Sequence, residues 1–218
     1  MPLALFDLDN TLLRGDSDYL WGRFLVEQCI VDDNWYEQQN RRFFDDYRQG
    51  TLDIQAYLRF QGAILARHDT ATLQTWHDQF MRSHIEPIVL EQGRACLEEH
   101  RRRGNVLVMI TATNRFVTAP IARLLQMDHL LATDLEMVEG RFSGQPEGVP
   151  CFQSGKVTRL QQWIEQTGHS LQGSWFYSDS HNDLPLLQQV DHPVAVDPDD
   201  RLRHYAIDHG WPIVTFRD

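Results

Sequence analysis

LALFDLDNT, residues 3–11, sets the fold expected of this 218-residue chain. An apolar run from Leu3 to Phe6 leads directly into Asp7 and Asp9, which stand two residues apart. Successive side chains of a strand alternate between its faces, so the two carboxylates point the same way. Two like charges about 4 Å apart repel by roughly 4 kcal/mol at an effective dielectric constant near 20. The pair therefore needs a cation, a shared proton or open water, and the end of this strand is a candidate site.

Further short, β-rich apolar runs follow the first one along the chain. They lie at residues 106–111, 174–179, 193–197 and 212–216. None of them alternates between apolar and polar residues, which is typical of parallel strands buried on both faces. Segments with helical character separate them, at residues 86–103, 114–126, 156–168, 182–189 and 199–209. This order predicts an α/β fold with a doubly wound, Rossmann-like and mainly parallel sheet, and LEMVEGRFSG (135–144) predicts a β-hairpin at its edge.

The stretch from residue 16 to residue 85 interrupts this order of strands and helices. Its apolar residues recur at intervals of three and four, which indicates helices throughout. Pro87 then marks the return to the α/β pattern. We expect residues 1–15 and 86–218 to form an α/β core domain, and residues 16–85 to form an all-helical domain inserted after the first strand.

Composition and charge exclude several classes of protein. Hydrophobic residues make up 42% of the chain and aromatic residues 11%, which is enough to build a core. The formal net charge of -11 argues against a nucleic-acid partner. The compact basic run Arg101–Arg103 stands before Gly104, where cations favour the C-terminal end of a helix.

Cysteine usage and hydropathy predict a location and no membrane partner. Cys29, Cys96 and Cys151 lie far apart without a zinc-ligand pattern, so we expect a reducing compartment and packing roles. No apolar stretch approaches the roughly 20 residues that a membrane span requires. The N-terminal residues also lack the basic and apolar regions of a secretory signal. The expectation is a cytoplasmic protein.

Acidic side chains follow several of the predicted strands. Asp7 and Asp9 end the first strand, Thr111 ends the second, and Asp179 and Asp183 follow the run 174–179. Ligands of open parallel α/β sheets bind at the carboxyl ends of the strands, so these groups should meet. Such a cluster of carboxylates suits Mg²⁺, whereas no histidines stand at zinc-ligand spacing.

Lys156 is the only lysine of the chain, and arginines supply the other 19 of the 20 basic residues. A compact ammonium group acts as a point charge where a planar guanidinium does not fit, so Lys156 is a candidate site residue. The alternative is an incidental lysine at the surface of a helix. The surrounding FQSGKVT does not fulfil the nucleotide-loop pattern GxxxxGK[ST], because Val157 stands in place of Ser or Thr.

Taken together, these segments resemble the four motifs of the haloacid dehalogenase superfamily. The matching stretches are DLDNT (7–11), Ile110-Thr111, Lys156 and SDSHNDLP (178–185), in the order that the family has. A helical insert after the first motif, with the DxxND form of the fourth, is similar to the phosphoserine phosphatase branch, which includes bacterial phosphatases for phosphoserine and for histidinol phosphate. The resemblance implies a phosphatase whose helical insert is a cap over the site.

The resemblance also implies a role for each motif residue. Asp7 would attack phosphorus and form an aspartyl-phosphate intermediate. Asp9 would protonate the leaving alkoxide and later take a proton from the attacking water. Thr111 and Lys156 would hold the oxygens of the transferring phosphoryl group.

The metal ligands and a further phosphate contact follow from the same resemblance. Mg²⁺ would be held by the carboxylate of Asp7, the backbone carbonyl of Asp9 and Asp179, with Asp183 orienting the ligands. Asn182 would donate a hydrogen bond near the phosphate. Dehalogenases need no acid at the position of Asp9, which favours a phosphatase.

Asp16 bears on the choice of substrate. It stands where phosphoserine phosphatases carry an acid that meets the amino group of their substrate, and it equally fits the N-cap of a following helix. Phosphoserine would also need a cation for its carboxylate, for which Arg42, Arg48 and Arg59 are candidates. The sequence Thr111-Ala112-Thr113 departs from the Ser-Gly-Gly of phosphoserine phosphatases.

Histidinol phosphate carries an amine and an imidazole but no carboxylate, so it is the favoured substrate, with phosphoserine as the alternative. Aromatic residues of the helical insert could stack on its ring or form the core of the insert. They are Trp21, Trp35, Tyr36, Phe43, Phe44 and Tyr47. The expected partner is a small phosphorylated metabolite, and the oligomeric state stays open.

Two other classes of protein remain as alternatives. A receiver-type signalling domain also phosphorylates an Asp at a strand end with Mg²⁺, but it would lack the helical insert. A non-catalytic binding module could retain the motifs as a relic. Steady turnover of a phosphomonoester separates both from an enzyme.

Overall fold

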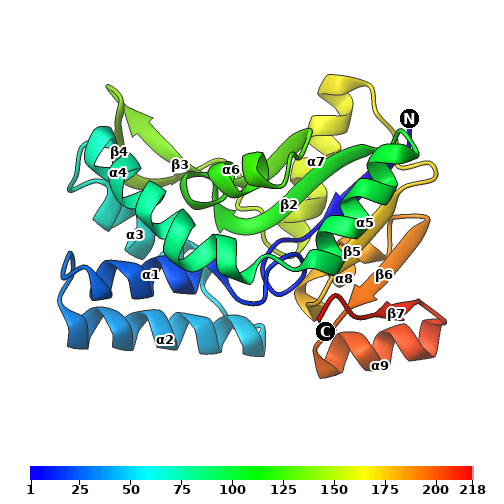
Figure 1. The fold of residues 1–218 in the computed structure, drawn as a ribbon, viewed down its shortest axis with the longest axis horizontal. Helices are drawn as coiled ribbons and strands as arrows, with labels where there is room; N and C mark the ends of the chain where they lie inside the picture. The colour runs from blue at the N-terminus through cyan, green and yellow to red at the C-terminus, as the bar shows by residue number, and fades with distance from the viewer. Residues whose placement is uncertain (218) are drawn as a thin grey trace.

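The computed structural model describes residues 1–217, with Asp33 described by its backbone alone, and is built around one twisted sheet (Figure 1). Its strands are ordered β4-β3-β2-β1-β5-β6-β7. Their bounds are β1 (Leu3–Phe6), β2 (Val106–Asn114), β3 (His129–Val138), β4 (Arg141–Glu147), β5 (Trp175–Ser178), β6 (His192–Val196) and β7 (Ile213–Val214). Neighbouring strands pair in parallel except β3 and β4. The predicted doubly wound, mainly parallel sheet is confirmed.

Helices cover both faces of the sheet, and β1 shows how the sequence divides between them. One face is covered by α5 (Glu91–Arg102) and α6 (Arg115–Leu124), and the other by α7 (Ser154–Thr167), α8 (Leu184–Leu187) and α9 (Asp200–His209). Ala4 and Phe6 belong to the core on the side of α5 and α6, whereas Leu3 and Leu5 belong to the core on the side of α7, α8 and α9. All four residues of β1 are fully buried, so both faces of the strand must be apolar, as its unbroken apolar run predicts.

Residues 16–85 form helices that stand at one end of the sheet, beside α6, β3 and β4 (Figure 1). These are α1 (Ser17–Glu27), α2 (Asp33–Gln49), α3 (Ile54–Leu65) and α4 (Thr70–Phe80), followed by a π-helical turn, η1 (Met81–Ile85), and a short 3₁₀ turn, η2 (Glu86–Ile88). An aspartate caps the N-terminus of each of the four α-helices. The predicted helical character of this stretch is confirmed.

The ends of the helical stretch are held together where it leaves and rejoins the sheet domain. Leu13 and Val89 form an antiparallel bridge. The Leu90 amide donates to the carbonyl of Leu12 over 3.0 Å, and the Arg14 amide donates to the carbonyl of Ile88 over 2.7 Å. The chain therefore exits and returns at neighbouring points.

The hairpin at the edge of the sheet is longer than predicted. Its first strand, β3, begins at His129, and residues 129–131 pair in parallel with β2 before the strand turns into the antiparallel pairing with β4. The positive φ angles of Glu139 and Gly140 make the turn. The first part of β3 was not predicted, because HLLATD mixes polar with apolar residues and only its neighbour β2 supplies its hydrogen bonds.

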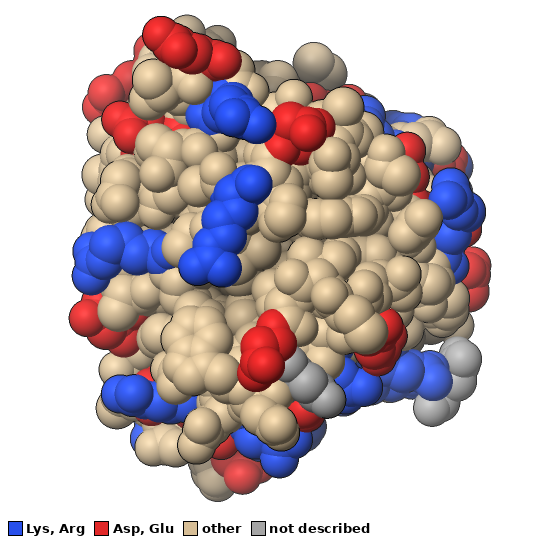
Figure 2. All heavy atoms as spheres, turned by 90° about the vertical axis from the view of Figure 1, so that its left-hand side faces the viewer, with Lys and Arg blue, Asp and Glu red and all other residues tan. Residues whose placement is uncertain are grey.

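Surface features agree with several of the sequence predictions, and one cysteine prediction is wrong. Arg101 and Arg102 lie in the last turn of α5, beside Glu98 and Glu99, so this basic run is the end of a helix. All three cysteines are free, but Cys29 is exposed and does not pack in a core. At the end of the molecule formed by the helices, acidic and basic side chains are interspersed (Figure 2). Among residues 1–217, no helix has the length and apolarity needed to cross a membrane.

Candidate active site

Lys156 joins two of the predicted site residues below the sheet's carboxyl edge. Its Nζ lies 2.7 Å from Oδ1 of Asp7 and 2.8 Å from the carboxylate of Asp183. All three side chains are buried. Burial would lower the pKa of Lys156, but the charges of Asp183 and Asp7 outweigh it and hold that pKa above its ordinary value. Lys156 is therefore a charged ammonium between two carboxylates.

The first turn of α7 is shaped to bring Lys156 to this place. A Cβ atom at Gly155 would lie 2.0 Å from the carbonyl oxygen of Pro150, so only glycine fits there. Gln153 enters the helix with a φ of 50°, in the left-handed region. These backbone features let the helix begin deep against the sheet.

Asp7 follows β1 directly, with its amide bonded to the carbonyl of Tyr177 over 2.9 Å. Burial raises the pKa of Asp7 to about 7, Lys156 opposes this rise, and the charges of Asp183 and Asp9 add to it. Asp7 thus lies between a lysine that favours its ionised form and carboxylates that disfavour it.

Asp9 points to a different group of partners from Asp7. Its Oδ2 accepts a hydrogen bond from the Thr113 hydroxyl over 2.8 Å, and its Oδ1 accepts one from the amide of Ser17 over 2.6 Å. Burial, with a contribution from the charge of Asp16, raises the pKa of Asp9 to about 7. Asp9 can therefore exchange a proton near neutral pH.

The hydroxyl of Thr111 is buried beside these groups and accepts a hydrogen bond from the Thr113 amide over 3.2 Å. Thr113 was not singled out by the sequence analysis. Its signal is the spacing of two from Thr111, and its amide and hydroxyl contact Thr111 and Asp9.

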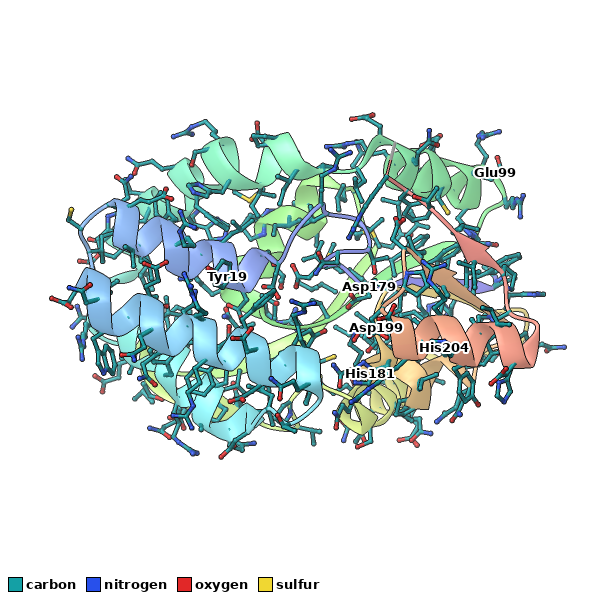
Figure 3. The ribbon with its side chains drawn as sticks, turned by 90° about the horizontal axis from the view of Figure 1, so that it is seen from below. Tyr19, Glu99, Asp179, His181, Asp199 and His204 are labelled. Carbon is teal, nitrogen blue, oxygen red and sulfur yellow. The ribbon has the colours of Figure 1, made fainter. Side chains whose placement is uncertain are left out.

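Asp179 lies where β5 ends, facing the loop after β1. Its amide donates to Oγ1 of Thr11 over 3.1 Å, and the Thr11 hydroxyl donates back to Oδ1 over 3.3 Å. Burial and the charges of Asp7 and Asp183 raise its pKa well above the ordinary value. Figure 3 shows Asp179 near His181 and Asp199, on the side of the core that faces the helices of residues 16–85.

The carboxylates at the strand ends have the chemistry that Mg²⁺ prefers. Asp7, Asp179 and Asp183 lie close enough for their charges to act on one another, and Lys156 contacts two of them, Asp7 and Asp183. Within residues 1–217, no group of three or more His, Cys, Asp or Glu side chains is placed to hold a metal ion. Mg²⁺ needs no such group, because it keeps several waters and takes one or two carboxylates and a phosphate. The hard oxygen ligands and the excess of negative charge fit this ion.

A small cavity of about 40 Å³, partly open to solvent, lies between the sheet and the helices. Its floor is Asp7, Asp9, Thr111, Ala112 and Thr113. Its walls are Asp16, Asp18, Tyr19, Asn40, Phe43, Phe44, Tyr47, Leu52, Ile54 and Tyr57. The floor carries Asp7, Asp9 and Thr111, which the sequence analysis placed at strand ends.

Asp16 fills the capping position and also lines this cavity. Its Oδ1 accepts hydrogen bonds from the amides of Asp18 and Tyr19 over 3.0 and 2.8 Å, so the N-cap prediction is confirmed. Burial raises the pKa of Asp16 to about 7, and the charge of Asp18 adds to the rise. Its contact with a substrate amine stays a prediction.

Asn182 is engaged by protein groups. Its Oδ1 accepts from Nε2 of Gln153 over 2.9 Å, and its Nδ2 donates to the carbonyl of Tyr47 over 3.3 Å. The amide thereby links α7 and the last turn of α2, and its predicted contact with phosphate stays a prediction.

Cations proposed for a substrate carboxylate lie outside the cavity. None of the described residues that line it is Lys or Arg. Arg42 is exposed and lies 3.9 Å from Asp46, Arg59 is exposed, and Arg48 lines a neighbouring groove that includes Asp179.

The aromatic residues of the helices divide between core and cavity. Trp21 and Tyr36 are fully buried in the core, and Trp35 is 60% exposed. Phe43, Phe44 and Tyr47 line the cavity, and they lie within two successive turns of α2. Of the six aromatic residues proposed to stack on a substrate ring, three therefore line the cavity.

Comparison with known proteins gives consistent results. The family model for haloacid dehalogenase-like hydrolases matches residues 4–188. The chain is 41% identical to a histidinol-phosphatase of Neisseria meningitidis over 99% of both chains. It is 31% identical to a phosphoserine phosphatase of Mycobacterium tuberculosis, over 98% of this chain and 70% of that one. A crystal structure of a protein of unknown function from Bordetella pertussis superposes with a TM-score of 0.94, at 41% identity over 99% of both chains.

Proposed function

The chain belongs to the haloacid dehalogenase-like hydrolases, and from that premise we propose a Mg²⁺-dependent phosphatase for a small amine-bearing phosphomonoester, with histidinol phosphate as substrate. The observation that carries the choice of substrate is the charge of the cavity. Asp7, Asp9, Asp16 and Asp18 line it, and its described lining contains neither Lys nor Arg. Such a lining favours ligand groups that are cationic or donate hydrogen bonds, and it disfavours a ligand carboxylate.

In the proposed reaction, Asp7 and Asp9 act in two steps. An oxygen of Asp7 forms a bond to phosphorus while the ester bond to the alkoxide breaks, and Asp9 gives its proton to that alkoxide. Asp9 then takes a proton from a water whose oxygen attacks phosphorus, which releases Asp7 and inorganic phosphate. The pKa of about 7 for Asp9 suits a group that must both give and take a proton near neutral pH.

Lys156 and Thr111 support the phosphoryl transfer in this proposal. Lys156, at 2.7 Å from Asp7, favours the ionised form of the nucleophile and offsets the charge of the phosphoryl oxygens. The buried hydroxyl of Thr111 offers those oxygens a hydrogen bond. The site residues of this proposal that touch phosphorus or its oxygens are thus Asp7, Thr111 and Lys156.

Mg²⁺ would be held by Asp7, Asp179 and the backbone carbonyl of Asp9, with Asp183 in support. When bound, it supplies charge stabilisation to the phosphoryl group. Residues 16–85 would act as a cap domain that covers the site, since three of its helices contribute walls of the cavity.

A direct comparison of substrates tests the proposal. We expect kcat/KM for histidinol phosphate to exceed that for phosphoserine by at least about tenfold, because the carboxylate of phosphoserine would meet like charges. The measurement is phosphate release from both esters, with p-nitrophenyl phosphate as a reference for the catalytic groups. Equal or greater efficiency on phosphoserine would contradict the choice of substrate.

Phosphoserine remains the second candidate, supported by the 31% identical relative. It would require a cation that reaches the cavity. Of the three proposed arginines, Arg48 lines the neighbouring groove together with Asp179. Steady turnover of any ester would exclude the receiver-like and non-catalytic alternatives.

A further inference from the structure

Asp18 is a buried carboxylate that the proposed chemistry does not use. It lies in the first turn of α1, is 5% exposed, and lines the cavity. Within the described residues, its Oδ1 has no hydrogen-bond partner. Buried polar atoms almost always have one, so an orphaned carboxylate oxygen at a cavity wall calls for a donor from elsewhere.

The groups that face Asp18 do not supply a countercharge. Burial raises the pKa of Asp18 to about 7, the Tyr57 hydroxyl interacts with it and opposes the rise, and the charge of Asp9 adds to it. Asp16 is a second acid close by. Tyr57 also accepts from Nε2 of Gln61 over 2.9 Å, which fixes its hydroxyl beside the carboxylate. The surroundings thus contain hydroxyls and further acids, and the missing element is a positive or N–H-bearing group.

Aromatic side chains beside Asp18 define the shape of that group. Phe43 and Tyr57 contact each other with ring centroids 5.1 Å apart, and both line the cavity. Flat apolar rings beside one acid suit a planar ring with an N–H at its edge, because the faces contact the aromatics while the N–H reaches the carboxylate.

We propose that Asp18 is a specificity-determining residue that accepts a hydrogen bond from a ring N–H of the substrate, whose ring packs against the wall formed by Phe43 and Tyr57. This inference rests on the proposed function and adds a second recognition point to Asp16, which takes the aliphatic amine. The substrate class is then a phosphomonoester with two nitrogen groups, one of them in a planar ring, and no carboxylate.

A simpler role for Asp18 is the favourable placement of an acid near the N-terminus of a helix. That role operates for exposed acids and needs neither a cavity nor burial. It also makes no distinction between ligands, which separates it from the proposal by experiment.

The experiment uses inhibition of p-nitrophenyl phosphate hydrolysis by three amino alcohols. Histidinol carries the amine and an imidazole, phenylalaninol carries the amine and a ring without N–H, and 2-aminopropan-1-ol carries the amine alone. In the unchanged protein, we expect the inhibition constant of histidinol to be at least about tenfold lower than those of the other two. Equal constants for histidinol and phenylalaninol would overturn the proposal without any variant.

Asp18→Ala should remove the advantage of histidinol over phenylalaninol. Asp18→Asn should reduce it, because the amide oxygen still accepts a hydrogen bond but carries no charge. The ratio of the two constants within one variant is the readout, so a change in turnover does not affect it. Asp53→Asn is the matched control, because Asp53 caps α3 with an exposed side chain and does not line the cavity. An undiminished ratio in either Asp18 variant would refute the role of Asp18.

The outcomes separate this proposal from the proposed function. If histidinol binds through Asp18 but its phosphate ester is not the preferred substrate, the proposed function fails and the ring subsite stands. If histidinol phosphate is preferred and the ratio does not depend on Asp18, the subsite fails and the proposed function stands.

Discussion

Lys156 is the residue whose chemical type is most constrained by its surroundings. Its Nζ reaches Asp7 and Asp183 at 2.7 and 2.8 Å inside a fully packed site. A planar guanidinium is larger and cannot occupy the same point between two carboxylates. This explains why position 156 carries a lysine, although the other 19 of the 20 Lys and Arg residues are arginines.

We expect Lys156→Arg to lower kcat/KM for p-nitrophenyl phosphate by at least about a hundredfold, although it keeps the charge. Arg159→Lys is the control on the same helix, because Arg159 pairs with Asp134, which does not line the cavity. Turnover of Lys156→Arg within a few-fold of the unchanged protein would contradict the argument.

The ionisation of Asp18 makes stability depend on pH. Its pKa in the folded protein is about 7, above the ordinary value of 3.8. A raised pKa means that the folded state holds the proton more tightly, so this contribution to stability is present below pH 4 and is lost as pH rises through 7. The charged and titratable groups that face it are Asp9, Asp16, Tyr36 and Tyr57.

Asp18→Asn should therefore raise the melting temperature at pH 8 and flatten its decline between pH 5 and pH 8. Each unit of pKa difference corresponds to about 1.4 kcal/mol, and each kcal/mol to roughly 2–4 °C for a chain of this size. Thermal melts of Asp18→Asn and Asp53→Asn over this pH range provide the measurement. If the melting temperature falls equally steeply with pH in both variants, the ionisation of Asp18 does not destabilise the folded protein.

Site residues that belong to a sequence motif were predictable. Residues that line the cavity only because of tertiary packing were less predictable. Asp7, Asp9 and Thr111 could be singled out because the carboxyl ends of parallel strands meet at one edge, and Lys156 because it is the only lysine of the chain. Asp18 could not, since an acid in the first turn of a helix is ordinary, and only the tertiary arrangement buries it against Tyr57.

At the scale of elements, α3 and β4 pack at a contact where side chains are excluded. A Cβ at Gly62 would lie 2.7 Å from the carbonyl oxygen of Gly144, so the helix and strand backbones touch. This contact fastens the helical stretch of residues 16–85 to the edge hairpin.

Gly62→Ala should push α3 away from β4 and destabilise the protein by about 1–3 kcal/mol, despite the better helix propensity of alanine. The free energy of unfolding from urea titration measures it. Gln55→Ala on the exposed side of α3 is the control and should leave that free energy nearly unchanged or slightly higher. If both variants have the same free energy of unfolding, the backbones of α3 and β4 can move apart without destabilising the protein.

Elements with a strong internal pattern were predicted well, and those that depend on a neighbour were not. The buried strands and the four helices of residues 16–85 carry their own periodicity. The first part of β3 is short and mixed in polarity, and it becomes a strand because β2 offers it hydrogen bonds at Val108, Met109 and Ile110. Element ends shifted for the same reason, as in the extension of β2 to Asn114.

At the scale of the whole molecule, the carboxylates of the site come from distant parts of the chain. Asp7 follows β1, whereas Asp179 and Asp183 follow β5, and each raises the energy of the other charges. A divalent cation would offset this repulsion across segments that the sequence separates.

We expect EDTA to abolish turnover and Mg²⁺ to restore it. Independently of activity, Mg²⁺ should raise the melting temperature of the protein at pH 8, and this gain should shrink in Asp179→Asn. Melting curves with and without Mg²⁺ provide the second readout. Full turnover in EDTA together with no thermal effect of Mg²⁺ would contradict the proposed metal.

The last turn of α2 is held to the core through its main chain. Asn182 donates to the carbonyl of Tyr47, and Arg201 donates to the carbonyl of Gln49 over 3.4 Å. Any amino acid presents the same carbonyl, so mutation at positions such as Phe43 and Phe44 can reshape the binding chamber while the anchoring of the helix persists. Selection for a new metabolite could therefore begin on that helix without first rebuilding its attachment.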